Sequence, residues 1–126
     1  MNRDICFSGT VVHGKKFGRV LGFPTANIDR KEYSRKKIKI RFGIWSGIVQ
    51  ISNSRLQIQN FKAAIIIGPL DGRGLPKLEA HILGFSGNLY GKKITFCLKN
   101  FIRPYKAFKT IKELQEQIKK DISTIK

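Results

Sequence analysis

Residues 77–101 read KLEAHILGFSGNLYGKKITFCLKNF and hold the two clearest strand signals in the chain. The ranges 77–85 and 92–101 are both rich in apolar, β-branched and aromatic residues, which is typical of strands. Between them, Ser86-Gly87-Asn88 is a hairpin-type turn signal. The stretch therefore predicts two strands joined by a hairpin.

Shorter runs of the same kind come earlier in the chain, and Gly and Pro separate them. Because glycines inside strands often mark bends or bulges, we expect them at Gly43 and Gly47. The expected strands are Ile5–Val12, Ile38–Ile51 and Phe61–Ile67. The expected irregular segments are the loop Gly14–Gly22, a turn-prone segment Phe23–Ile28 around Pro24, the charged exposed stretch Arg30–Lys37 and the loop Gly68–Pro76.

The C-terminal end of the chain changes from the strand period to the helix period. Thr110 and Glu113 form a T-x-x-E capping box, which marks the start of a helix. Apolar residues then recur at spacings of three and four, at Ile111, Leu114, Ile118 and Ile122. Several short strands followed by one amphipathic helix predict a mostly β fold, either a small β-barrel or a sheet that the helix covers. We expect residues 1–126 to form a single domain.

Net charge is the strongest feature of the composition. The 126 residues contain 25 Lys and Arg against 8 Asp and Glu, a formal net charge of +17. Such a field attracts polyanions, including nucleotides, nucleic acid and membrane phosphates, and does not choose among them. No apolar run approaches the roughly 20 residues that span a bilayer. Since no secretory signal is visible either, we expect a cytoplasmic protein without a membrane partner.

The two cysteines, Cys6 and Cys97, lie inside separate apolar runs. Buried free thiols are the expectation, because two cysteines define no disulfide framework, and a disulfide is the alternative. Neither cysteine belongs to a CxxC or CxxH pair, so we expect no zinc site.

Two adjoining segments carry residue types that suit a metal–polyphosphate complex. Gly14–Gly22 has three glycines and three basic residues, which lets the backbone approach an anion, but it has no Walker A ending. A basic loop without a ligand is the alternative. In Gly22–Asn27, Pro24 stiffens a turn that can present the Thr25 hydroxyl and the Asn27 amide oxygen to Mg²⁺. Alternatively, Thr25 and Asn27 bond only to nearby backbone.

Glu79 is the one acidic residue inside an apolar, strand-like run. Strand alternation places Glu79 and His81 on one face and the apolar residues around them on the other. Beside an anionic substrate, such a carboxylate could act as a general base. The alternative is a polar strand face that is open to water.

The segment Phe101–Phe108 interleaves aromatic and basic residues. This composition could stack a flat ring and hold an anion, and it could equally bind single-stranded nucleic acid. A third interpretation is a loop that packs its aromatic rings under the terminal helix.

Taken in order, these segments resemble the riboflavin kinase family. The range 11–27 ends in GRVLGFPTAN, which is close to the family's N-terminal signature. Phe42–Trp45 is similar to its YGVY strand, residues 78–91 to its EVHLLDF…LYG segment, and residues 103–121 to its LRPExxF…QIxxD ending. The resemblance covers nearly the whole chain, from about Ile5 to Asp121.

The resemblance implies a small closed antiparallel β-barrel with a C-terminal α-helix. It implies transfer of the γ-phosphoryl of Mg-ATP to the ribityl 5′-hydroxyl of riboflavin, giving FMN and ADP. Thr25 and Asn27 would hold Mg²⁺, and an unpaired Glu79 across the cleft would accept the proton of the hydroxyl. The implied ATP-binding residues are Gly14, Gly18, Arg19, Thr25, Ile82, Gly84 and Tyr90. The implied flavin-binding residues are Arg103, Lys106 and Phe108.

The chain departs from the family pattern at two places and in its length. Gly68–Arg73 replaces a usual Pro-Thr-Phe string, and Gly84 replaces a usual acidic residue. Many bacterial relatives carry an N-terminal adenylyltransferase domain that is not in this sequence, so we expect the reaction to stop at FMN.

The main alternative function is a basic nucleic-acid-binding β-barrel without catalysis, because it would account for the net charge of +17. It requires neither the LGFPTAN string nor an acid at position 79. A flavin-binding domain that has lost catalysis is a further alternative, against which Thr25, Asn27 and Glu79 together argue. We therefore expect a monomer whose partners are riboflavin and ATP, without specific nucleic-acid binding.

Overall fold

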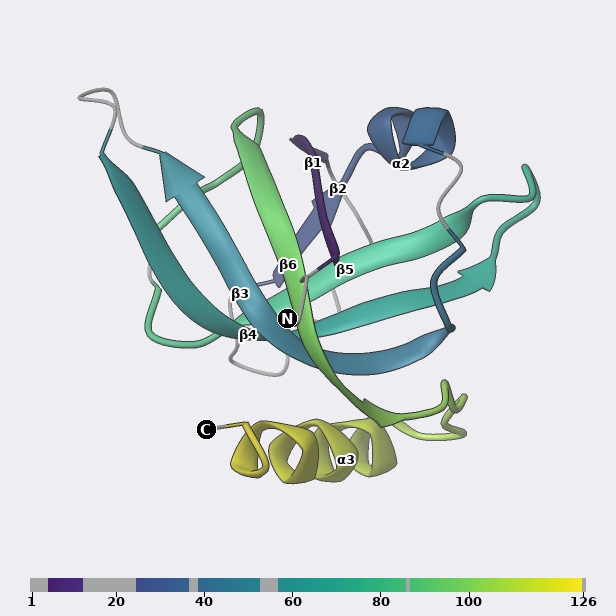
Figure 1. Cartoon of the computed structure of the whole chain (residues 1–126). Helices are drawn as coiled ribbons and strands as arrows, with labels where there is room; N and C mark the ends of the chain where they lie inside the picture. The colour runs from purple at the N-terminus through teal and green to yellow at the C-terminus, as the bar shows by residue number, and fades with distance from the viewer. Residues whose placement is uncertain (1–4, 13–24, 37–38, 53–56, 86, 126) are drawn as a thin grey trace.

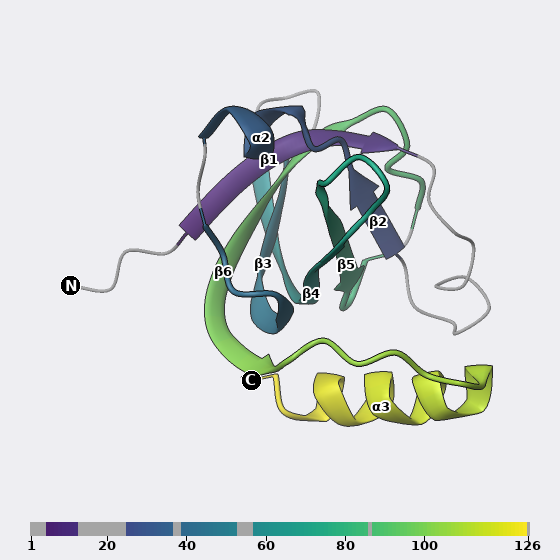
Figure 2. The ribbon, with the colours of Figure 1, turned by 90° about the vertical axis from the view of Figure 1, so that its right-hand side faces the viewer.

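A computed structural model describes residues 5–12, 25–36, 39–52, 57–85 and 87–125, which form a closed barrel with helices outside it (Figures 1 and 2). The strands are β1 (Ile5–Val12), β2 (Thr25–Ile28), β3 (Gly43–Ser52), β4 (Ile58–Leu70), β5 (Pro76–Ile82) and β6 (Lys93–Arg103). The helices are α2 (Lys31–Lys36) and α3 (Ile111–Ser123). The expected mostly β, closed antiparallel barrel with a C-terminal helix is confirmed.

The barrel closes in the strand order β1-β2-β5-β4-β3-β6, and β6 pairs with β1. The predicted hairpin over residues 77–101 is therefore wrong, since β5 pairs with β2 and β4 whereas β6 pairs with β1 and β3. The connecting segment instead docks on the end of β1. There Val11 N–H donates to the Lys92 carbonyl at 2.8 Å, and Gly91 N–H donates to the Val11 carbonyl at 2.9 Å. A local turn signal did not reveal this long-range pairing.

Several segment boundaries differ from the sequence-based expectation. Strand β3 begins at Gly43, so residues 39–42 of the expected strand Ile38–Ile51 are not strand, and β5 ends at Ile82 and not at residue 85. Residues 25–28 form strand β2 and not a turn, because Ala26 and Ile28 bury their side chains in the barrel. Strand β4 is longer than the expected range 61–67, since both of its ends pair with neighbouring strands. The charged stretch after β2 contains helix α2, which is not wholly exposed. Tyr33 of this helix is buried, and its ring meets the Phe7 ring edge-on with the two centroids 5.7 Å apart.

Gly43 and Gly47 allow β3 and β6 to approach closely. The register of β3 against β6 shifts once near each glycine, which confirms the expected irregularities. A Cβ atom at Gly47 would overlap the carbonyl oxygen of Cys97, and one at Gly43 would overlap the carbonyl oxygen of Arg103. Gly43 also has a φ of 150°, which side-chain-bearing residues rarely adopt. The glycines thus hold the end of β6 against β3.

Apolar side chains from all the strands fill the interior of the barrel. The largest of those that are fully buried are Phe7, Phe96, Ile65, Ile67, Ile82, Ile94 and Val49. The rings of Phe7 and Phe96 meet edge-on with centroids 5.8 Å apart. A small barrel whose interior is packed in this way leaves no lumen for a ligand. Among the described residues, the place for a binding site is therefore the outer surface and not the interior of the barrel.

Helix α3 covers part of that outer face, on the side of the barrel opposite to α2 (Figures 1 and 2). The Thr110 side chain accepts a hydrogen bond from Glu113 N–H at 3.2 Å, so the predicted cap is confirmed. Ile118 and Asp121 are the buried residues of the helix. Among the described residues, no helix is long and apolar enough to cross a membrane.

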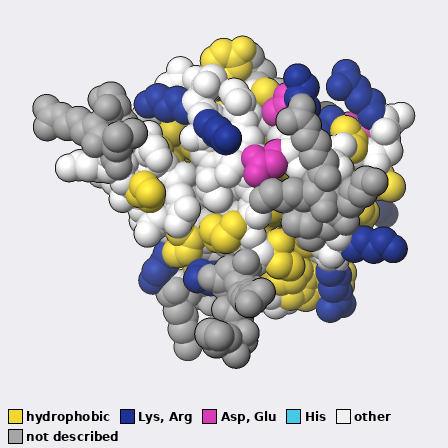
Figure 3. Space-filling view, turned by 45° about the horizontal axis from the view of Figure 1, so that its top comes forward, with side chains coloured by type: hydrophobic (Ala, Val, Ile, Leu, Met, Phe, Trp, Pro, Cys, Tyr) yellow, Lys and Arg dark blue, Asp and Glu magenta, His cyan; other side chains and the backbone are white. Residues whose placement is uncertain are grey.

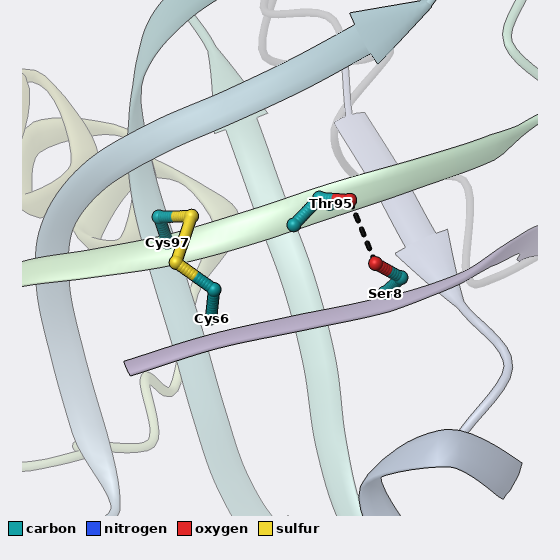
Figure 4. The surroundings of a disulfide bond; sticks show 4 residues. All are labelled: Cys6, Ser8, Thr95 and Cys97. Carbon is teal, nitrogen blue, oxygen red and sulfur yellow. Dashed lines mark hydrogen bonds between the residues drawn. A yellow bond between two sulfur atoms is a disulfide. The ribbon is translucent and has the colours of Figure 1, made fainter. Parts of the chain in front are cut away.

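The expectation of free thiols is wrong, because Cys6 and Cys97 are joined by a disulfide (Figure 4). The two residues are direct partners in the β1–β6 register, although 91 positions separate them in sequence. Two positions further along β1, the hydroxyls of Ser8 and Thr95 share a hydrogen bond of 2.7 Å. Both cross-strand pairs fasten the seam at which the first strand meets the last. The barrel register that brings the sulfurs together could not be seen in the sequence.

Candidate active site

Two rows of side chains cross the outer face of the barrel from β2 to β6. The first, the Glu79 row, consists of Asn27, Glu79, Ile66, Ile44 and Arg103. The second, the His81 row, consists of Thr25, His81, Ala64, Ser46 and Asn100. Residues directly opposite in an antiparallel ladder point to the same face. The register therefore gathers residues that are far apart in sequence onto one surface.

Glu79 is buried in this surface and has a partner. It is 6% exposed, and its Oε2 lies 2.7 Å from Nζ of Lys77, two residues earlier on the same strand. The expectation of an unpaired carboxylate is therefore wrong. The alternative of a polar face open to water is also wrong, because His81 is only 4% exposed. Lys77 offsets part of the desolvation cost of burying a carboxylate.

His81 connects β5 to β2 beside Glu79. Its Nδ1 lies 3.1 Å from the Thr25 hydroxyl oxygen, so Thr25 does not bond only to nearby backbone. Burial lowers the pKa of His81, and the nearby Lys77 charge acts in the same direction, whereas the Glu79 charge opposes it. A neutral imidazole can accept the Thr25 proton through Nδ1. Such a bond would fix the rotamer of Thr25.

Thr25 and Asn27 supply neutral oxygens next to Glu79, which fits a hard cation. Both are half-buried and lie on the outward face of β2, in register with His81 and Glu79 respectively. Mg²⁺ in phosphoryl-transfer sites takes few protein ligands and completes its shell with water and substrate phosphates. The described residues contain no group of three His, Cys, Asp or Glu that could hold a metal alone. The donor set therefore fits a metal that arrives with a polyphosphate.

A cavity of about 450 Å³ lies between this outer face and the C-terminal part of the chain. Ile44, Ala64 and Ile66 form its apolar floor, and Leu114 and Ile118 of α3 lie among its lining residues. Glu79 also lines the cavity, whereas Thr25 and Asn27 are not among the lining residues. Among the described residues, the charged side chains of the lining are Lys77, Arg103, Lys106, Lys109, Glu79 and Asp121. Excess positive charge around an apolar slot suits a flat ligand that carries, or receives, an anionic group.

The residues that the sequence suggested for a flavin all line this cavity. Phe108 is half-buried, with Nζ of Lys106 5.6 Å and Cζ of Arg103 5.9 Å from its ring centroid. Arg103 also makes a two-pronged ion pair with Asp121, through Nε to Oδ1 at 2.9 Å and NH2 to Oδ2 at 2.8 Å. The arginine is thus engaged inside the protein before any ligand binds.

Other residues suggested for ATP lie elsewhere or outside the described chain. Gly14, Gly18 and Arg19 fall outside the described residues. Ile82 is 1% exposed and belongs to the core of the barrel, and neither Gly84 nor Tyr90 lines the cavity. Their assignment to the nucleotide stays a prediction.

Sequence reasoning gave no role to three charged residues of the cavity, Lys77, Lys109 and Asp121. Strand period alone could have found Lys77, because residues two apart on a strand share a face. Asp121 follows Ile118 by three positions and therefore lies on the covered side of the helix. The apolar floor formed by β3 and β4 could not be predicted from the sequence, because it depends on how these strands pair in the barrel.

The fold and this cavity define a β-barrel with an external site for a small ligand. A family model described as Flavokinase: Riboflavin kinase matches residues 1–126. This chain therefore belongs to the riboflavin kinase family, whose members are kinases.

Individual proteins agree with this family. The chain is 37% identical, over 94% of its length, to a protein of Bacillus subtilis named RNA-binding riboflavin kinase RibR. It is 33% identical, over its full length, to a bifunctional riboflavin kinase/FMN adenylyltransferase of Buchnera aphidicola. The chain spans 48% and 39% of the length of these two relatives. A crystal structure of riboflavin kinase from Trypanosoma brucei superposes with a TM-score of 0.69 at 25% identity, covering 97% of this chain and 77% of that one.

Burial of His81 predicts a pH-dependent stability. An unfolded histidine titrates near 6.5, and the pKa of folded His81 is lower. As the pH falls below about 6.5, the unfolded chain binds a proton that the folded chain resists, so stability present above this pH is lost. The substitution His81→Gln removes the contribution of this histidine to the pH dependence of stability. We therefore expect the free energy of unfolding, measured by urea titration with Trp45 fluorescence, to fall less between about pH 7 and pH 5 in the variant than in the parent. An equal fall in both proteins would contradict a lowered pKa of His81.

Proposed function

We propose that this chain transfers the γ-phosphoryl of ATP, bound with Mg²⁺, to the ribityl 5′-hydroxyl of riboflavin, giving FMN and ADP. The observation that carries the proposal is the Glu79 row, in which Asn27 and Glu79 are register partners and Arg103 ends the same row. The row joins an oxygen donor for a metal, a carboxylate and the rim of an apolar cavity. A kinase acting on a flat, sparingly charged acceptor needs these three parts side by side.

The cavity suits the ring system of the acceptor. Its floor is formed by the small and branched side chains of Ile44, Ala64 and Ile66, and it is bounded on the other side by residues that include Phe108 and Leu114. A tricyclic ring can bury both faces between these two layers, with Phe108 able to stack on it. The ribityl chain would then extend along the row toward Glu79.

Glu79 is the group that we assign to the 5′-hydroxyl. A carboxylate can accept the hydroxyl hydrogen bond, orient the oxygen toward phosphorus and take its proton late in the transfer. Lys77 holds one carboxylate oxygen, and this contact fixes the orientation of the other. Since most of the catalytic effect in phosphoryl transfer comes from positioning and charge neutralisation, Glu79 need not be a strong base.

The nucleotide would lie on the β2 side of Glu79. Thr25 and Asn27 would hold Mg²⁺, which would neutralise negative charge on the phosphates during transfer. The hydrogen bond between Thr25 and His81 supports this role, because it leaves the Thr25 oxygen in a fixed place. Residues 14–22 precede β2 directly, so their glycines and Arg19 are the candidates for the phosphate groups. Catalysis in the cytoplasm by a monomer stays a prediction.

Specific nucleic-acid binding is the weaker candidate. A relative is named an RNA-binding riboflavin kinase, but this chain spans only 48% of that protein. In Figure 3 the Lys and Arg side chains of the described residues are spread around the face in view. A net charge of +17 supports general attraction of polyanions and by itself carries no sequence readout.

The direct test is an assay with riboflavin, ATP and Mg²⁺, followed by chromatography of flavins and nucleotides. We expect FMN and ADP in equal amounts. Replacing Glu79→Gln should lower kcat by roughly 10²- to 10⁴-fold with little change in nucleotide affinity, because the group that accepts the hydroxyl proton is lost. The exposed Glu116→Gln on α3 is the matched control and should behave as the parent does. Absence of FMN from the folded parent would overturn the function, and normal turnover in Glu79→Gln would remove Glu79 from it.

Asn27→Ala tests the metal site without relying on turnover. The variant lacks one of the two proposed oxygen ligands, so Mg²⁺-dependent binding of ADP should need at least about tenfold more metal, given that even indirect partners of a metal are worth that much. Calorimetric titration of ADP at stepwise Mg²⁺ concentrations measures this directly. Metal-free riboflavin binding serves as the control and should not change. Superimposable metal titrations of parent and variant would exclude Asn27 as a ligand.

A further inference from the structure

The ion pair between Arg103 and Asp121 is buried and bonded at both ends. Asp121 is 4% exposed, and both of its oxygens accept from the Arg103 guanidinium. Gln117 Nε2 also donates to Oδ1 of Asp121 at 3.0 Å. The third Arg103 bond runs from NH1 to the Pro104 carbonyl at 3.2 Å. Three of the five guanidinium N–H groups are therefore in use.

This ion pair joins the two ends of the segment that bounds the cavity. Arg103 is the last residue of β6 and the end of the Glu79 row, whereas Asp121 lies in the last turns of α3. Both side chains line the cavity, together with residues 105–110 of the connecting segment. The pair thus closes a loop of chain around the cavity, from the end of the barrel wall to the far part of the helix.

A buried ion pair is an inefficient way to hold a helix in place. Desolvation of the two charges consumes much of their attraction, and apolar residues of similar size often stabilise as well or better. What a two-pronged arginine–carboxylate pair adds is a defined distance and orientation. Cζ of Arg103 also lies 5.9 Å from the centroid of the Phe108 ring, which bounds the cavity. An arginine held in one orientation therefore also helps to hold this ring in place.

We propose that Arg103 and Asp121 are positioning residues for the flavin acceptor: their ion pair fixes α3 and Phe108 over the cavity, and so sets the affinity for the riboflavin ring. Arg103 then acts through Asp121 and not by binding the ring itself, which replaces the role expected from its sequence position. The inference rests on the proposed function, because it takes riboflavin as the ligand of the cavity.

A double-mutant cycle tests the pair in the full chain. The variants are Arg103→Met, Asp121→Asn and the combination, with Glu116→Gln on the same helix as the control. Riboflavin affinity is measured by flavin fluorescence without nucleotide, and ADP affinity with Mg²⁺ by calorimetry. We expect each single variant to weaken riboflavin binding about tenfold. The double variant should bind riboflavin no more than about twofold more weakly than either single variant. ADP affinity should not change in any of them. In kinetics the KM for riboflavin should rise and the KM for ATP should not.

Each other pattern contradicts the inference in a recognisable way. Loss in Arg103→Met with no loss in Asp121→Asn would mean that Arg103 binds the flavin directly. Unchanged riboflavin affinity in both, or equal losses for riboflavin and ADP, would reduce the pair to a structural role. Arg103→Lys gives a second check, because lysine keeps the positive charge but cannot bind both oxygens of Asp121 at once. It should recover only part of the riboflavin affinity that Arg103→Met loses. If the parent neither binds riboflavin nor forms FMN, the proposed function fails and the inference fails with it.

Discussion

The pairing of β2 with β5 is the constraint on which the site depends. It sets Asn27 opposite Glu79 and Thr25 opposite His81, although about 50 positions separate the partners in sequence. In an antiparallel ladder a shift of β2 by one residue would turn Thr25 and Asn27 toward the core, away from Glu79 and His81. Ala26, Ala80 and Ile28 resist such a shift, because they fill the interior from the same two strands. Core packing therefore fixes the geometry of the polar face.

The filled interior explains why the site is external. A small six-stranded barrel has no lumen once side chains such as Phe7, Phe96 and Ile65 occupy it. The chain instead builds a second layer, in which α3 and the segment before it cover the outward face of β3, β4 and β5. The cavity lies between these layers and joins an apolar floor to the charged end of the Glu79 row. Two layers that the Arg103–Asp121 ion pair joins at one end can admit a flat ligand between them.

Local sequence patterns correctly predicted the features that depend only on local structure. The capping box and the apolar stripe correctly predicted α3, and alternation placed Glu79 and His81 on one face. Strand pairing was beyond such patterns: Ser86-Gly87-Asn88 predicted a hairpin that does not form, and Cys6 gave no sign of its partner Cys97. For the site, residue types pointed to Glu79 and the LGFPTAN string. Lys77 and Asp121 lie at positions that strand and helix periods could have found, but their ion-pair partners depend on the packing.

The central claim is that the flavin ring lies between the barrel wall and α3, with the ribityl chain directed at Glu79. A crystal structure of the protein with riboflavin and Mg²⁺–ADP measures this most directly. The account predicts the ring between Ile66 and Phe108, and the 5′-oxygen within hydrogen-bonding distance of a Glu79 carboxylate oxygen. A ring bound elsewhere, or a 5′-oxygen remote from Glu79, would contradict it.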